Sequence, residues 1–170
     1  AGTTLPTPMY ALYATTMGFT VLTTTMIYAA YAGGVLAALV IFGRWSDAIG
    51  RRPVLLAGVI LAVASAATFL VADTVPALGA ARVLSGLSAG LFTGTATAAI
   101  IEAAPPKWRT WAAATATIAN IGGLGIGSLL AGVLVQYGPA PLQLAFVIHI
   151  VLAAVAGLSI ILVPETSSKT

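Results

Sequence analysis

The side chains that could bind a ligand or carry a proton are few in this sequence, and four of the eleven charged ones stand in one short stretch. Only 6% of the 170 residues are Asp, Glu, Lys or Arg. Residues 43–53 read Gly-Arg-Trp-Ser-Asp-Ala-Ile-Gly-Arg-Arg-Pro, so a carboxylate lies close to three guanidinium groups. Arginines at such positions can bind carboxylates or the carboxyl ends of helices. The stretch is therefore a candidate for charged contacts between helices.

Arg82 is the one basic residue inside an apolar run. It follows Pro76 by about two helical turns, roughly 9 Å along the axis. A charge at that depth of a membrane costs at least ~1–3 kcal/mol unless it is paired, hydrated or able to reach the interface. Arg82 therefore either extends to the membrane surface or faces a cavity, where it would bind an anion or tune an acid that carries protons. We favour the cavity.

Two tyrosines and one histidine in the apolar runs are further candidates. Tyr28 and Tyr31 are one helical step apart on the same face, and their hydroxyl groups need partners. They either line a cavity or bond to a neighbouring helix, and we take them with Arg82 as candidates for the cavity or for proton coupling. His149 is the single histidine, and such a residue is more often a packing residue than a ligand or a proton relay.

The sequence contains no recognisable catalytic, cofactor-binding or metal-binding set of residues. It has no cysteine, no glycine-rich phosphate loop after a strand and no basic surface for nucleic acid. We therefore expect no enzyme, no cofactor, no bound metal and no nucleic-acid partner.

The elements that must position these residues are long apolar runs. Hydrophobic residues make up 59% of the chain and its mean hydropathy is +1.05, which places it in a lipid bilayer. A helix of about 20 residues crosses the ~30 Å hydrocarbon core. Before the first run, Leu5-Pro6-Thr7-Pro8 interrupts any helix. The sequence predicts an all-α membrane protein with five complete spans, at about 20–42, 54–72, 77–101, 111–135 and 142–163.

The basic residues outside the spans indicate how the chain is oriented. They fall on one side, and the loops on the opposite side hold no Lys or Arg. The positive-inside rule makes the first side cytoplasmic. We expect a multi-pass integral membrane protein, of a bacterial inner membrane, whose chain ends in the cytoplasm. The basic residues on this side are Arg44, Arg51, Arg52, Lys107, Arg109 and Lys169.

Small residues recur at or near every fourth position of two predicted spans. Such a stripe gives a smooth face that lets another helix approach closely. The glycines assigned to helix packing are Gly86, Gly90, Gly94, Gly123, Gly127 and Gly132.

Three of these motifs resemble motifs of the major facilitator superfamily. The order Gly, three residues, Asp, two residues, Gly-Arg-Arg in 43–53 resembles the loop between the second and third transmembrane helices of that family, with Ala48 where a basic residue is usual. Residues 82–90 resemble the arginine-and-glycine motif of its fourth helix. Residues 123–132 resemble the fifth-helix motif of its antiporters, with Ser128 in place of the usual proline.

The resemblance implies a fold and a function. The fold is one six-helix half of a transporter, the amino-terminal one, with its first helix truncated to a remnant at 1–13 and the carboxy-terminal half absent. Such halves enclose a cavity whose access alternates between the two sides of the membrane. The implied function is secondary transport of a small organic solute, with proton-coupled efflux by antiport as the first choice. Lipid, solute, protons and the absent half are the expected partners.

Two alternatives to this function stay open. One is proton-coupled uptake of a sugar or an organic acid. The other belongs to a different class: a membrane scaffold or assembly subunit that does not transport, in which the glycines only pack helices.

The resemblance also implies how the charged loop acts. The first motif arginine of the family lies near an acid at the end of the fourth helix, which corresponds here to Arg51 and Glu102. We expect an Arg51–Glu102 ion pair that acts as a latch favouring the outward-open state, with Asp47 free to cap a helix or to pair with the absent half. The residues assigned to this loop and to gating are Gly43, Asp47, Gly50, Arg51, Arg52 and Glu102.

Overall fold

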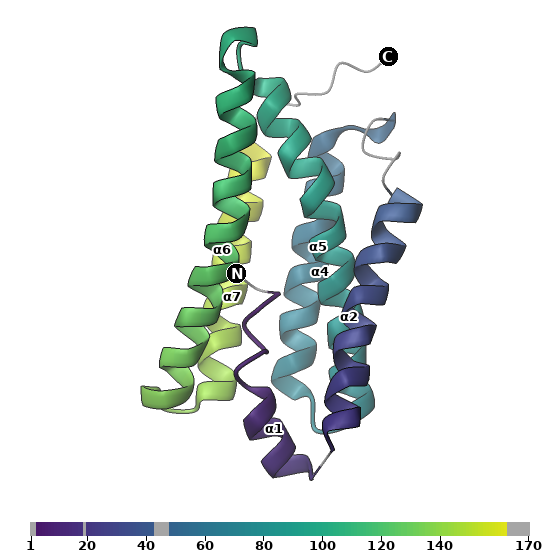
Figure 1. Ribbon diagram of the computed structural model, residues 1–170, viewed down its shortest axis with the longest axis vertical. Helices are drawn as coiled ribbons and strands as arrows, with labels where there is room; N and C mark the ends of the chain where they lie inside the picture. Colours follow the sequence, from purple (N-terminus) through teal and green to yellow (C-terminus); the bar gives the residue numbers. More distant parts are fainter. Residues whose placement is uncertain (1–2, 19, 43–47, 163–170) are drawn as a thin grey trace.

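The structure is a bundle of long helices that run side by side (Figure 1). It is a computed structural model that describes residues 3–18, 20–42 and 48–162. Within these residues there is no strand, and five helices are long and apolar enough to cross a membrane, which confirms the predicted all-α membrane fold. The helices are α1 (Tyr10–Met17), α2 (Val21–Phe42), α4 (Arg51–Val71), α5 (Val75–Ala103), α6 (Arg109–Tyr137) and α7 (Pro141–Leu162), with a short 3-10 turn η1 (Pro106–Trp108) before α6.

Glycine and proline mark where two of these helices begin. Gly50 precedes α4 with φ 112° and ψ 158°, a conformation that residues with a Cβ rarely adopt. Pro76 stands in the first turn of α5, where its missing N–H is not needed for an intrahelical bond. Gly43 and Asp47 lie outside the described residues, so the structure gives no account of that part of the charged loop.

The first segment differs from the predicted helix remnant at 1–13. Residues 3–9 form turns, and the helix of this segment is α1, which starts later. Pro6 and Pro8 explain the difference, because proline lacks the N–H that a helix interior requires. The segment nevertheless packs against the long helices. Its buried side chains include Leu5, Met9, Tyr10 and Tyr13.

α5 is the helix around which the packing is arranged. It lies against α2 and α4, α7 packs on α4, and α6 contacts both α5 and α7 (Figure 1). The α2–α5 contact is close because glycines face each other across it. A Cβ on Gly34 would lie 2.6 Å from the carbonyl oxygen of Val83, and a Cβ on Gly86 would overlap the carbonyl oxygen of Tyr31. A Cβ on Gly90 would likewise lie 2.9 Å from the carbonyl oxygen of Val35.

The other glycines assigned to packing are placed differently. Among the described residues, a Cβ on Gly94 or Gly132 would meet nothing within 4 Å, so these two glycines do not make the close contact expected of them. Every fourth position turns about 40° around a helix, so Gly94 is rotated about 80° from Gly86 and leaves the contact with α2. On α6, Gly127 is buried and Gly123 is partly buried.

Candidate functional site

Arg82 lies inside the bundle, where α5 meets α1, α2 and the segment before α1. The residue is only 1% exposed. Its Nε donates a hydrogen bond to the hydroxyl of Tyr10, and its Nη1 donates one to the backbone carbonyl of Thr3 over 2.8 Å. An arginine that extends to the membrane surface keeps its head group in water. The burial of Arg82 therefore excludes that interpretation.

Four aromatic rings surround the guanidinium group of Arg82, and together they form what we call the aromatic cage. The distance from Arg82 Cζ to the ring centroid is 5.1 Å for Tyr10, 5.4 Å for Tyr28, 5.5 Å for Tyr31 and 6.0 Å for Phe69. Rings at such distances attract a cation by about 0.5–2 kcal/mol each when their faces are turned toward it. The structure thus brings Tyr28 and Tyr31 together with Arg82, and the rings partly replace the water that the cation has lost.

One nitrogen of the guanidinium group remains without a partner. Arg82 Nη2 and the nearby Thr3 Oγ1 are both buried and make no hydrogen bond within the described part of the chain. A buried polar group in this state costs about 1–3 kcal/mol. None of the hydrogen bonds and ion pairs found among the described residues joins Arg82 to a carboxylate. Arg82 Nη2 can therefore donate one more hydrogen bond, and an anionic acceptor would bind it most strongly.

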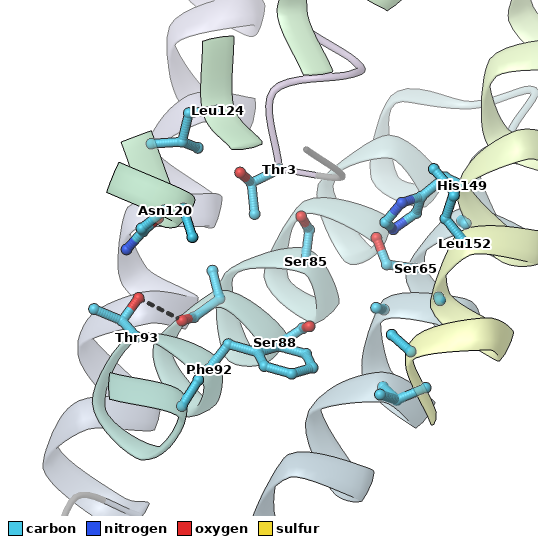
Figure 2. A pocket seen from close by; sticks show the side chains of 18 of the residues that line it. Thr3, Ser65, Ser85, Ser88, Phe92, Thr93, Asn120, Leu124, His149 and Leu152 are labelled. Carbon is cyan, nitrogen blue, oxygen red and sulfur yellow. Dashed lines mark hydrogen bonds between the residues drawn. The ribbon is translucent and has the colours of Figure 1, made fainter. Parts of the chain in front are cut away.

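A cavity of about 540 Å³ lies between α4, α5, α6 and α7. Figure 2 shows Ser65 and His149 on one side of it and Asn120 and Leu124 on the other. The wall is otherwise mostly apolar, with many alanines and with Phe92 from α5. No Asp, Glu, Lys or Arg is among the described residues that line it, so any polar recognition in this cavity is by uncharged groups.

The hydroxyl groups of the wall are mostly engaged with the backbone. Ser65 Oγ donates to the carbonyl of Ala81 and Ser88 Oγ to that of Gly58, each over 2.8 Å. Both bonds cross from one helix to another and join α4 to α5. The oxygen of each serine can still accept a hydrogen bond.

Arg82 itself is not among the described residues that line this cavity, so its role in a cavity or in proton coupling stays a prediction. The cavity reaches the surroundings of Arg82 through Thr3 and Tyr31, which belong to its wall, whereas Tyr28 does not. His149 also lies in the wall of this cavity.

At one end of the bundle, the upper end in Figure 1, two adjacent arginines tie helices together. Arg51 binds Glu102 with two hydrogen bonds, from Nη2 to Oε1 over 2.6 Å and from Nε to Oε2 over 3.1 Å. The expected ion pair is therefore present and joins the start of α4 to the end of α5. Arg52 donates a hydrogen bond to the backbone carbonyl of Ile161 in the last turn of α7.

Sequence reasoning did not identify the backbone carbonyl of Thr3 or the hydroxyl of Tyr10 as partners of Arg82. Neither contact follows from helix periodicity, because both depend on how residues 3–9 fold back among the long helices. Asn120 and Ser85 were also missed in the cavity wall. The only available indication was that they are polar residues within apolar spans.

The comparison with known protein families agrees with this architecture. The family model described as Major Facilitator Superfamily matches residues 1–170. A comparison with curated proteins found no match. Because the family model covers the whole sequence, the chain belongs to the Major Facilitator Superfamily.

Proposed function

We propose that this chain forms the amino-terminal half of a transporter that expels a small organic solute in exchange for protons, by alternating access. Family membership supports secondary transport in general. The observation that carries the finer proposal is Arg82, a buried cation with an unpaired Nη2 and no carboxylate among its described partners. Such a cation can hold an acidic group of the transporter or of the solute while that group is deprotonated, and release it on protonation.

The surroundings of Arg82 support a role in coupling. The aromatic cage excludes water, so the energy of an ion pair formed at Nη2 would be larger than in a solvated site. The energy of such a pair falls strongly when its acid takes up one proton. This loss can shift the equilibrium between the two access states. We place the end of the bundle with Arg51 and Glu102 in the cytoplasm of a bacterial cell, following the distribution of basic residues.

The choice of efflux over uptake depends on residues 123–132, which resemble the antiporter motif. The cavity wall has no charged residue in the described part of the chain, which is compatible with a mainly apolar solute as well as with a sugar. Uptake of a sugar or an organic acid is therefore the second candidate.

A membrane scaffold is the candidate of another class, and the α2–α5 contact is the observation in its favour. Gly34, Gly86 and Gly90 are explained by close packing alone, without any transport. A scaffold gives no reason, however, for burying a cation beside a cavity with one of its nitrogens unpaired.

Proton movement in proteoliposomes tests these proposals. The full-length protein is reconstituted with the pH dye pyranine inside the vesicles, and a pH gradient is imposed. Lipophilic aromatic amines, sugars and small carboxylic acids are then added one at a time. Antiport predicts that an amine and protons move in opposite directions across the membrane, and symport predicts that a sugar or an acid moves with protons.

Two outcomes would contradict proton-coupled transport. The first is a lumenal pH that responds to no solute more than in vesicles without protein, which would favour the scaffold. The second is solute movement that ignores the pH gradient, which would remove proton coupling. Residues 1–170 alone are expected to give no gradient-driven flux unless they dimerise, because one wall of the central cavity would be absent.

A further inference from the structure

The interface between α4 and α7 is held at three levels. At one end, Arg52 donates to the carbonyl of Ile161. One helical turn further along α7, a Cβ on Gly157 would lie 3.1 Å from Val59 Cγ1, so the two helices touch there. Toward the other end, the rings of Phe69 and Phe146 stack with their centroids 4.8 Å apart and their planes 7° from parallel.

The contact of Arg52 differs in kind from the other two because it is polar and directional. Carbonyl groups in the last turn of a helix have no intrahelical N–H to bind. They also carry the partial negative charge of the helix dipole, which favours a cation at that end. A guanidinium group satisfies both needs through a charge-assisted hydrogen bond. The bond from Arg52 therefore fixes the end of α7 at a defined position along α4.

The same two helices supply much of the cavity wall. α4 contributes Val59 and Ser65, and α7 contributes His149 and Ala153. We propose that Arg52 is a positioning residue, which holds the end of α7 against the start of α4 and thereby sets how far apart these two parts of the wall lie. Its neighbour Arg51 has a separate partner on α5, so adjacent side chains fix α4 to two different helices.

The sequence allows a direct test, because it contains no cysteine. A Cβ on Gly157 would lie 3.9 Å from Val59 Cβ, and a disulfide joins Cβ atoms about 3.5–4.5 Å apart. The double variant V59C/G157C should therefore form a disulfide when copper(II)–phenanthroline accepts two electrons from the two thiols and their two protons pass to the solvent. The initial rate of disulfide formation is followed as the loss of labelling by maleimide-polyethylene glycol. This rate reports how much of the time the two helices are in contact.

Arg52→Gln in this double-cysteine background is expected to slow disulfide formation at least about threefold, because a charge-assisted bond at the end of the interface is lost. Arg52→Lys should restore part of the rate, since lysine can still donate to a carbonyl. Arg109→Gln is the matched control: it removes an exposed arginine at the start of α6 and should leave the rate unchanged. Equal rates in the Arg52→Gln and parent proteins would overturn the proposal.

A second readout separates positioning from a general effect on folding or topology. If Arg52→Gln lowers flux only because α7 is no longer held, the formed V59C–G157C disulfide should restore that flux, whereas the Arg109→Gln protein should show neither loss nor recovery. Lost flux that the disulfide does not recover would contradict positioning. This arm rests on the proposed transport function, but the cross-linking rate does not, so failure of one can be told from failure of the other.

Discussion

Two arginines on neighbouring helices, Arg51 and Arg82, are held in opposite ways. Arg51 stands at the start of α4 with 11% of its side chain exposed, and it binds both carboxylate oxygens of Glu102, which is 36% exposed. Arg82 is 1% exposed, and its described contacts are a hydroxyl, a backbone carbonyl and aromatic rings. The cation nearer to water has a full counter-charge, and the cation inside the bundle has none among the described residues.

The difference between their partners indicates a different role for each arginine. An ion pair near water contributes only about 0–1 kcal/mol, so the Arg51–Glu102 pair can form and open at little cost, as a latch requires. A buried cation without a counter-charge lowers stability, and its presence is explained if it binds a partner during function. Arg51 has its counter-charge in Glu102, whereas the burial of Arg82 without one among the described residues needs a functional reason.

The largest effect is expected from removing Arg82. Arg82→Ala in the full-length protein should lower proton-coupled flux at least about tenfold, equivalent to ~1.4 kcal/mol in activation free energy, because the charge that holds the acid is gone. Arg82→Lys should recover flux only in part, since lysine lacks the planar fork of arginine. Flux is measured with the pyranine assay, and membrane expression should stay near that of the parent protein.

An unchanged coupling ratio in the Arg82→Ala protein would show that this side chain serves packing alone. Arg109→Ala is a suitable control, because it removes the same charge from an exposed position outside the cage.

A smaller effect is expected from Gly86, which allows α2 to bring Tyr28 and Tyr31 to Arg82. Gly86→Ala would place a methyl group against the carbonyl oxygen of Tyr31. Such overpacking costs about 1–3 kcal/mol, and we expect a lower melting temperature in detergent together with reduced proton-coupled flux. The matched variant Gly94→Ala adds the same methyl group on the same helix where nothing lies within 4 Å, and should change neither quantity measurably.

The pair of glycine variants also sharpens the comparison of the two arginines. The contact that Gly86→Ala disturbs joins α2 to α5, whereas the Arg51–Glu102 pair joins α4 to α5. Equal loss of stability in the Gly86→Ala and Gly94→Ala proteins would mean that the close contact between α2 and α5 does not support the cage.

The helices of this molecule could be predicted, but the directions of their side chains could not. Apolar runs of about 20 residues between polar stretches are sufficient to place spans. These helices are apolar on all sides, so no amphipathic stripe shows which face meets the cavity. Asn120 and His149 therefore could not be placed in its wall from the sequence. The Arg51–Glu102 pair was predictable because both residues stand at helix ends, where the family motif sets their order.

The smallest effect is expected at the Arg51–Glu102 pair, and a double-mutant cycle in the full-length protein measures it. Arg51→Ala and Glu102→Ala should each reduce flux, and the double variant should be little worse than either single one, since all three lack the same contact. The coupling energy should be about 1 kcal/mol or less and should fall as salt is raised, because Glu102 is partly exposed. Additive losses of flux would contradict the latch and leave the two charges with a role in membrane topology only. A strong coupling that salt does not weaken would instead contradict the contrast with Arg82, because the pair would then behave as a buried one.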